Sequence, residues 1–265
     1  MKIQRFFKIY SIFTSQYLKR IMEYRFDFIT GLIGFFFIQI IGILFIQVVF
    51  EQIPDINGWS YYEILFIYGF AQIPRGLDHL LTDNLWFLSF NIVVKGEFDR
   101  YLLRPINPLF QLLSEVFQPD AFGELIVGIV LLSISIVKLN ISFSILNIFL
   151  LIISIIAGTV IYASIKLIFA SLSFWFKDSR SVMHMVYSVS DFAKYPVTIY
   201  GKVVQFIICY IIPFGFTAFF PAAYFVNKLP VLFAIGGTVM MSLIFACLSY
   251  WIWLQGINKY ESAGS

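Results

Sequence analysis

Charge is what this sequence has least of. Only 12% of its 265 residues are charged and 60% are hydrophobic, whereas soluble domains carry about 25% charged residues. Several apolar runs of about 20 residues match the thickness of a bilayer core. Barrel strands would be about ten residues long and alternate in polarity, which these runs do not. The sequence therefore predicts an all-α integral membrane protein.

Motifs that carry chemistry are scarce as well. Cys209 and Cys247 both lie within apolar runs, which argues against a disulfide framework and against a zinc site. The sequence contains no GxxxxGK[ST] phosphate-binding loop, so we do not expect this chain to bind ATP in that way. HExxH is absent, and His79 and His184 are far apart. We expect neither a catalytic nor a metal site, and no nucleic-acid partner.

The apolar runs predict six spans in one transmembrane domain over residues 1–265. The expected spans are residues 28–50, 61–94, 109–137, 145–176, 197–212 and 231–254. Residues 1–25 alternate basic and apolar positions at three-to-four spacing, which predicts an amphipathic helix at the interface rather than a plain basic flank or a signal peptide. Residues 213–230 are rich in Phe and interrupted by Pro. We interpret them as short helices that dip into the outer leaflet, a partly re-entrant segment.

Basic residues set the expected orientation, because cytoplasmic loops carry an excess of Lys and Arg. With the amino terminus inside, both termini are cytoplasmic and only Lys138 and Lys228 face outward. The inward set is Lys2, Arg5, Lys8, Lys19, Arg20, Arg25, Lys95, Arg100, Arg104, Lys177, Arg180 and Lys259. The reverse orientation would invert this imbalance.

The loop over residues 95–109, KGEFDRYLLRPINPL, is the most polar part of the middle of the chain. A simple connector needs no apolar stripe, whereas a short helix under the membrane with a protein docked below it would use one. An ordinary basic loop ended by proline is the alternative interpretation. The apolar stripe consists of Phe98, Tyr101, Leu102 and Leu103.

This loop resembles the coupling segment of permeases in the type-2 ABC exporter family. The matching residues are Gly96, Glu97, Phe98, Asp99, Leu102, Leu103, Arg104, Pro105 and Pro108. Within that family, the chain is similar to a bacterial subgroup with a GEFDxYLLRPINPLFQ-like core and two further elements. Those elements are Tyr195, Pro196, Ile199, Tyr200 and Gly201, followed by Ile212, Pro213, Phe214 and Pro221.

The resemblance implies a permease subunit of a bacterial cytoplasmic-membrane exporter that moves an amphipathic or lipid-like substrate. It also implies a second permease, identical or a sister chain, and a separate ATPase that binds ATP and Mg, so this chain itself needs no cofactor. ATPase contact is then expected at Gly96, Glu97, Phe98, Asp99, Arg100, Leu103 and Arg104, with Phe98 and Leu103 filling a groove.

Charged residues deep within the predicted second and third spans include Arg75, Asp78, Asp120 and Glu124. A charge at the bilayer centre costs at least about 2.5–3.5 kcal/mol, so it is usually paired or faces water. Arg75 lies roughly as deep in its span as Asp120 and Glu124 lie in theirs, which predicts a buried ion pair. Two interpretations stay open, a structural staple and a transport path. Asp191 and Lys194 are three apart and are expected to pair on one helix face.

Two rival functions use the same residues differently. An ATP-independent secondary transporter would use the intramembrane charges as a proton relay, although no internal repeat of the kind common in such transporters is evident. A membrane scaffold or immunity protein would transport nothing. Dependence on ATP distinguishes the first from an ABC permease, and co-purification with an ATPase distinguishes the second.

Overall fold

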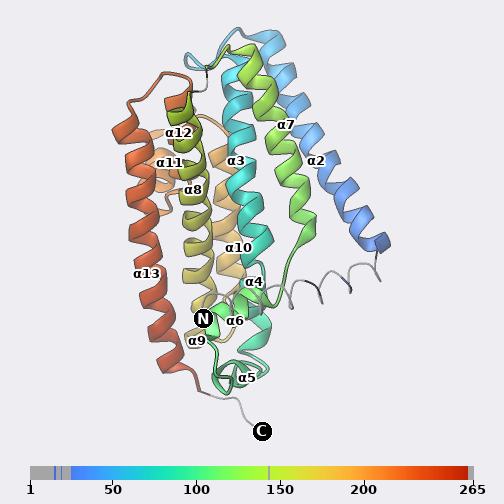
Figure 1. Cartoon of the computed structure of the whole chain (residues 1–265), viewed down its shortest axis with the longest axis vertical. Coiled ribbons are helices and arrows are strands. Elements are labelled where there is room, and N and C mark those ends of the chain that lie inside the picture. The colour runs from blue at the N-terminus through green and yellow to red at the C-terminus, as the bar shows by residue number, and fades with distance from the viewer. Residues whose placement is uncertain (1–14, 16–18, 20–24, 143, 262–265) are drawn as a thin grey trace.

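The structure is a computed structural model that describes residues 15, 19, 25–142 and 144–261. Within these residues the chain is a bundle of helices without a β-strand, apart from one isolated bridge between Ile56 and Trp59. Five long helices, α2, α3, α7, α8 and α13, run along the long axis of the molecule, and short helices gather at its two ends (Figure 1). The interfacial helix predicted over residues 1–25 lies outside the described residues except for isolated positions.

The long helices are α2 (Arg25–Gln52), α3 (Tyr61–Thr82), α7 (Phe122–Lys138), α8 (Ile145–Ser171) and α13 (Gly237–Lys259). The short α-helices are α4 (Asn84–Phe87), α5 (Asp99–Leu102), α6 (Pro108–Ser114), α9 (Ser173–Phe176), α10 (Arg180–Ser188), α11 (Lys202–Phe206) and α12 (Phe219–Phe225). The 3₁₀ and π segments are η1 (Leu88–Ile92), η2 (Pro119–Ala121), η3 (Val189–Lys194), η4 (Val197–Ile199), η5 (Ile207–Ile211), η6 (Phe214–Thr217) and η7 (Leu232–Gly236).

Four stretches of the described chain are helices long and apolar enough to cross a membrane. They are Ile29–Gln52, Pro119–Lys138, Ile145–Phe176 and Leu232–Lys259. Helix α3 is long enough as well, but it carries the charges that the sequence placed in the second span. A total of six spans stays a prediction, because the remaining predicted span is not one continuous helix.

Three of the predicted spans differ from the structure. The second ends its regular helix at Thr82 and continues only as short segments. The third is divided, because α6 ends at Ser114 and a new helical run begins at Pro119. The fifth is broken into η4, α11 and η5, and its longest helical run, Lys202–Ile211, would rise only about 15 Å, half of a bilayer core.

Local capping fixes where two of the long helices begin. The backbone N–H of Ser60 donates to Glu63 Oε2 at 2.8 Å at the start of α3, the reciprocal half of a capping box. The Ser144 hydroxyl accepts from the backbone N–H of Asn147 at 3.2 Å at the start of α8, as an N-cap serine does. Both starts lie at the end of the bundle opposite α5 (Figure 1).

Helices α3 and α7 cross at two glycines. A Cβ atom added to Gly69 would lie 2.8 Å from Leu131 Cβ and 2.9 Å from the backbone nitrogen of Leu132. A Cβ on Gly128 would lie 2.7 Å from Ile73. Small residues permit this close approach of backbones, which is how helices associate in lipid.

Helix α8 carries a strip of small residues, formed by Ser154, Ala157 and Gly158. All three are buried, and a Cβ on Gly158 would lie 2.9 Å from the carbonyl oxygen of Thr217 and 3.1 Å from Pro74. The strip therefore packs against α3 and η6, as expected for close helix contact.

The segment over residues 213–230 consists of short helices, as predicted. Its aromatic side chains are largely buried against the rest of the bundle, among them Phe214, Phe216, Phe219, Phe220 and Phe225. Its position within the outer leaflet stays a prediction.

Candidate functional site

Arg75 is the centre of a charged cluster in the middle of the bundle. It lies on α3 directly after Pro74, and its guanidinium contacts two acidic residues from other elements. Its Nε lies 3.6 Å from Glu124 Oε1 of α7, and its Nη1 donates to Asp191 Oδ1 of η3 at 2.7 Å. His79 Nδ1, one turn further along α3, lies 3.1 Å from Glu124 Oε2. Three elements are thereby joined through one arginine.

Lys194 extends this cluster on η3. Its Nζ donates to Asp191 Oδ1 at 2.8 Å, so Asp191 shares one carboxylate oxygen between two cations. The pairing of Asp191 with Lys194 is therefore confirmed, and so is the pairing of Arg75 with an acidic residue of the predicted third span.

Asp120 takes no part in this cluster. It lies in η2, before α7 begins, and accepts a hydrogen bond from Gln118 at 3.4 Å. Its carboxylate approaches α2, since a Cβ on Gly31 would lie 3.8 Å from Asp120 Oδ2. Of the two acidic residues expected near Arg75, the structure therefore joins Glu124 to it and leaves Asp120 outside the cluster.

A second charged group is centred on Lys166 of α8. Its side chain is fully buried, and its Nζ lies 2.8 Å from Asp78 Oδ2 and 3.2 Å from Asp83 Oδ1. The same Asp78 oxygen accepts from the hydroxyl of Tyr187 at 2.8 Å. Thr82 donates to the other Asp78 oxygen. Every polar atom around Asp78 thus has a partner, which is the condition under which a buried charge is tolerated.

The Lys166 ammonium does not extend toward the membrane surface, as a lysine near the end of a span can. It is neutralised inside the bundle by the carboxylates of Asp78 and Asp83. Lys166 lies ten residues before Phe176, the end of the helical run, or about 15 Å along a helix. This depth could have predicted the buried ion pair from the sequence, because a lysine so far from the interface requires a partner inside the protein.

Both charged groups connect α3 to the helices around it, and Tyr187 links them. Its ring stacks on the His79 ring with centroids 5.6 Å apart, and its hydroxyl binds Asp78. Sequence reasoning missed Tyr187. Its only sequence signal is a tyrosine on the apolar side of an amphipathic helix.

The loop after η1 is held to the bundle by Phe98. Gly96 adopts φ +68°, a left-handed conformation suited to glycine, and turns the chain back so that Phe98 points inward. The Phe98 side chain is fully buried against the rings of Phe174, Trp253 and Tyr260, with centroids 4.9, 5.8 and 5.1 Å away. This arrangement corrects one expectation, because a buried Phe98 does not fill a groove on another protein.

Glu115 holds the far side of the same loop. It accepts a short hydrogen bond from the Tyr101 hydroxyl and a second one from Arg100 Nη2 at 3.2 Å. Arg104 Nη1 lies 3.8 Å from its other oxygen. Burial, and then the hydrogen bond to the Glu115 carboxylate, raise the pKa of Tyr101 to about 12. Tyr101 therefore stays protonated and donates throughout the physiological range.

The tip of the loop is left exposed by this anchoring. Leu103 is 85% exposed, and Leu102 is also exposed. Arg100 and Arg104 flank these leucines, with half of each side chain accessible. The loop lies at the same end of the bundle as α9 and the last described residues of α13 (Figure 1).

The family described as ABC-2 family transporter protein matches residues 36–264 of this sequence. The chain belongs to this family. No curated protein matches it. Membership makes this ABC-2 protein the membrane component of an ABC transporter, the permease that works with an ATPase subunit, and agrees with its apolar membrane-length helices.

Proposed function

We propose that this ABC-2 permease is half of an ATP-driven exporter in a bacterial cytoplasmic membrane, paired with a second permease and powered by a separate ATPase. The ATPase docks on the tip of the loop over residues 96–104. The observation that carries this proposal is the contrast within that loop, where Phe98 is buried in the bundle while Leu103 is exposed between two arginines. Large exposed apolar residues beside charged ones are typical of a protein interface.

The direction of the chain in the membrane supports this docking. The loop, the turn from α9 into α10 and the end of α13 contribute basic residues to one end of the bundle (Figure 1), namely Lys95, Arg100, Arg104, Lys177, Arg180 and Lys259. The positive-inside rule makes that end cytoplasmic, where an ATPase and its ATP and Mg are available.

The anchoring of the loop gives a route for the power stroke. Movement of the tip is transmitted to the ends of α9 and α13, because Phe98 packs against Phe174 and Trp253 rather than against α3. Glu115, which directly follows α6, holds the loop to the end of that helix through Tyr101. Closure of the ATPases would then move the helix ends on both sides of the loop together.

The rival proton relay has less support. Arg75 pairs with Glu124 and Asp191, whereas Asp78 pairs with Lys166. Asp120 contacts neither group and bonds to Gln118. A relay needs titratable groups that can exchange protons along a path, whereas these pairs fit staples between helices. The proposed substrate stays amphipathic or lipid-like.

The docking site is tested with Leu103→Asp. We expect this variant to fold and insert, since Leu103 contacts solvent, but to lose recovery of the ATPase by at least about tenfold, the factor that corresponds to 1.4 kcal/mol. Lys259→Glu, an exposed change at the same end of the bundle, is the matched control. Quantitative mass spectrometry of a Walker-type ATPase co-purified from matched membranes measures the effect. Equal recovery from both variants contradicts the docking site.

Coupling is tested separately by reversing charge at Glu97 or Asp99. We expect ATP hydrolysis to continue without transport in proteoliposomes. The loop over residues 96–104 would still bind the ATPase but would no longer move with it. Transport that continues at the normal ratio to hydrolysis contradicts the proposal, and transport without any ATP favours the secondary transporter instead.

A further inference from the structure

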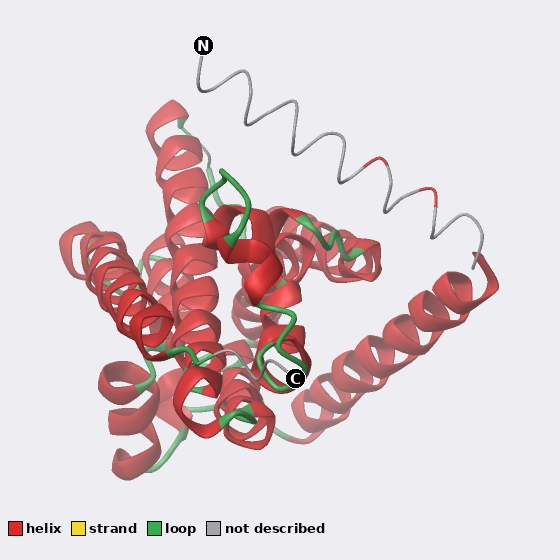
Figure 2. Cartoon of the chain, turned by 90° about the horizontal axis from the view of Figure 1, so that it is seen from below, coloured by secondary structure: helices red, strands yellow, loops and turns green. Residues whose placement is uncertain are grey.

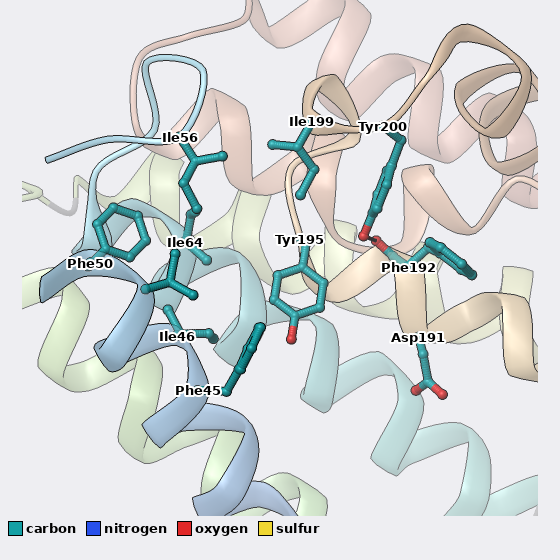
Figure 3. Close-up of a pocket in the computed structure, with 11 residues that line it drawn as sticks. Phe45, Ile46, Phe50, Ile56, Ile64, Asp191, Phe192, Tyr195, Ile199 and Tyr200 are labelled. Atoms are coloured by element: carbon teal, nitrogen blue, oxygen red, sulfur yellow. Dashed lines mark hydrogen bonds between the residues drawn. The ribbon is translucent and has the colours of Figure 1, made fainter. Parts of the chain in front are cut away.

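A cavity of about 510 Å³ lies between α2 and the chain from Asp191 to Tyr200 (Figure 3). Neither charged group fills it, and the loop at the cytoplasmic end lies elsewhere. Its size is within the range of small-molecule sites, about 300–1,000 Å³. Side chains of Ile46 and Val49 form one wall, and those of Phe192 and Ile199 form the other.

The size of the cavity limits its occupant. An α-helix with side chains is about 10–12 Å wide and rises 5.4 Å per turn, so one turn occupies roughly 400–600 Å³. The cavity therefore offers about the volume of one helical turn. One apolar chain of a small amphiphile fits in this cavity. On entering it, the chain would leave the lipid and contact apolar side chains of the protein.

The polar end of the cavity is defined by Asp191. Figure 3 shows Asp191 at one end of the cavity and Ile56 at the other. The Asp191 side chain is 56% exposed. Its Oδ1 accepts from Arg75 and Lys194, and within the described chain no residue donates to its Oδ2. The free oxygen is an acceptor available to a head group that donates a hydrogen bond.

The charge balance selects a neutral head. The cluster around Asp191 contains two cations, Arg75 and Lys194, and two carboxylates, Asp191 and Glu124, so these four groups have a formal net charge of zero. A cationic head would approach Arg75 and Lys194, and an anionic head would meet the exposed carboxylate. A hydroxyl satisfies the acceptor without adding charge.

We propose that this cavity binds a single-chain amphiphile with an uncharged, hydroxyl-bearing head. The chain lies between α2 and the Phe192–Ile199 wall, and the hydroxyl donates to Asp191 Oδ2. This inference rests on the proposed function in one respect, because it assigns the class of substrate that the exporter moves.

Photolabelling tests the site without any ATPase. The purified permease in phosphatidylcholine nanodiscs is exposed to a photoreactive long-chain alcohol or to the carboxylic acid of the same chain length. Labelled peptides are identified by mass spectrometry. We expect the alcohol to label residues 45–50 and 192–199 at least about tenfold more than the acid, which corresponds to 1.4 kcal/mol. Equal labelling by both probes means that the cavity holds only ordinary bilayer chains, and overturns the proposal.

Two adjacent valines of α2 supply the matched variants. Val49 lines the cavity, whereas Val48 is exposed and does not. We expect Val49→Trp to lower alcohol labelling by about tenfold and Val48→Trp to leave it unchanged. Ile199→Trp fills the cavity from the opposite wall, so the result does not depend on one variant remaining folded. Unchanged labelling in both cavity-filling variants overturns the site.

The outcome is separable from that of the proposed function. Alcohol-selective labelling together with ATP-independent transport would keep the site and reject the exporter. Recovery of the ATPase through Leu103 without alcohol-selective labelling would keep the exporter and reject this substrate class.

Discussion

Helices α2 and α3 have opposite compositions and opposite environments. Apolar α2 has the highest hydropathy of the four membrane-length stretches, yet only 11% of its most apolar window is buried. Charged α3 carries Glu63, Arg75, Asp78 and His79, yet 13 of its 22 residues are buried. Seen from the end of the bundle, α2 stands apart while α3 lies among the other helices (Figures 1 and 2).

The burial of charged α3 and the exposure of apolar α2 are explained by the lipid that surrounds the protein. Lipid tails are as apolar as leucine, so apolar surface gains little from burial between helices, whereas polar groups must find partners inside the protein. The charged residues of α3 therefore pair with residues of the surrounding helices. The close contacts of α3 with α7 and α8 are made at glycines, namely Gly69, Gly128 and Gly158. Comparison of α2 with α3 therefore shows that hydrophobicity alone does not decide which helix is buried.

The largest effect expected from this comparison comes from removing the buried cation that α3 shares with α8. Lys166→Met leaves Asp78 and Asp83 without their common partner. Breaking a buried ion pair by removing one member costs about 3–5 kcal/mol, so we expect most of the stability in detergent to be lost. Thermal unfolding followed by circular dichroism measures the change.

Lys259→Met, at an exposed position, is the control for losing one lysine. Combining Lys166→Met with Asp78→Asn should recover part of the loss, because one unpaired carboxylate is then removed as well. A single Lys166→Met variant as stable as its control would show that the Lys166 pair does not hold α3 in place.

A smaller effect is expected from adding one methyl group to each helix in turn. Gly69→Ala on α3 would place a Cβ 2.8 Å from Leu131, and overpacking of this kind costs about 1–3 kcal/mol. Gly34→Ala on α2 meets nothing within 4 Å, and we expect it to change stability by less than about 0.5 kcal/mol. Chemical denaturation in mixed micelles compares them. Equal effects would mean that α3 is not packed more tightly than α2.

The sequence was sufficient for features that depend on composition and short spacing. Membrane helices follow from the length of the apolar runs, and the pairing of Asp191 with Lys194 follows from their spacing on a helix. The pairing of Arg75 with an acidic residue of the next span follows from the cost of an isolated charge in lipid. The breaks in the predicted spans could not be found in this way. Residues 197–212 are rich in apolar residues like a span, yet they form the three separate segments η4, α11 and η5.

The loop over residues 95–109 shows the same limit at the scale of one side chain. Its apolar stripe correctly marked a surface segment with an apolar face, but a stripe does not state which residue faces the bundle. Phe98 turns inward because three aromatic rings from distant parts of the chain, on α9 and α13 and after it, form its site. Leu103 remains outside because nothing in the described structure covers it.

The smallest effect concerns the two hydrogen bonds through which Gln39 of α2 contacts α3. Gln39 Oε1 accepts from the Tyr68 hydroxyl and from Gln72 Nε2, both at 2.6 Å. Gln39→Leu leaves both donors unsatisfied, and interhelical hydrogen bonds in membranes are worth about 0.6 kcal/mol on average and at most about 1.7. We expect a loss in that range by unfolding in mixed micelles. Gln47→Leu is the control, because Gln47 binds only Glu51 of its own helix. If Gln39→Leu were as stable as this control, the hydrogen bonds of Gln39 would not hold α2 to α3. The contact between the two helices would then depend on side-chain packing alone, and the contrast between polar α3 and apolar α2 would not extend to the buried glutamine of α2.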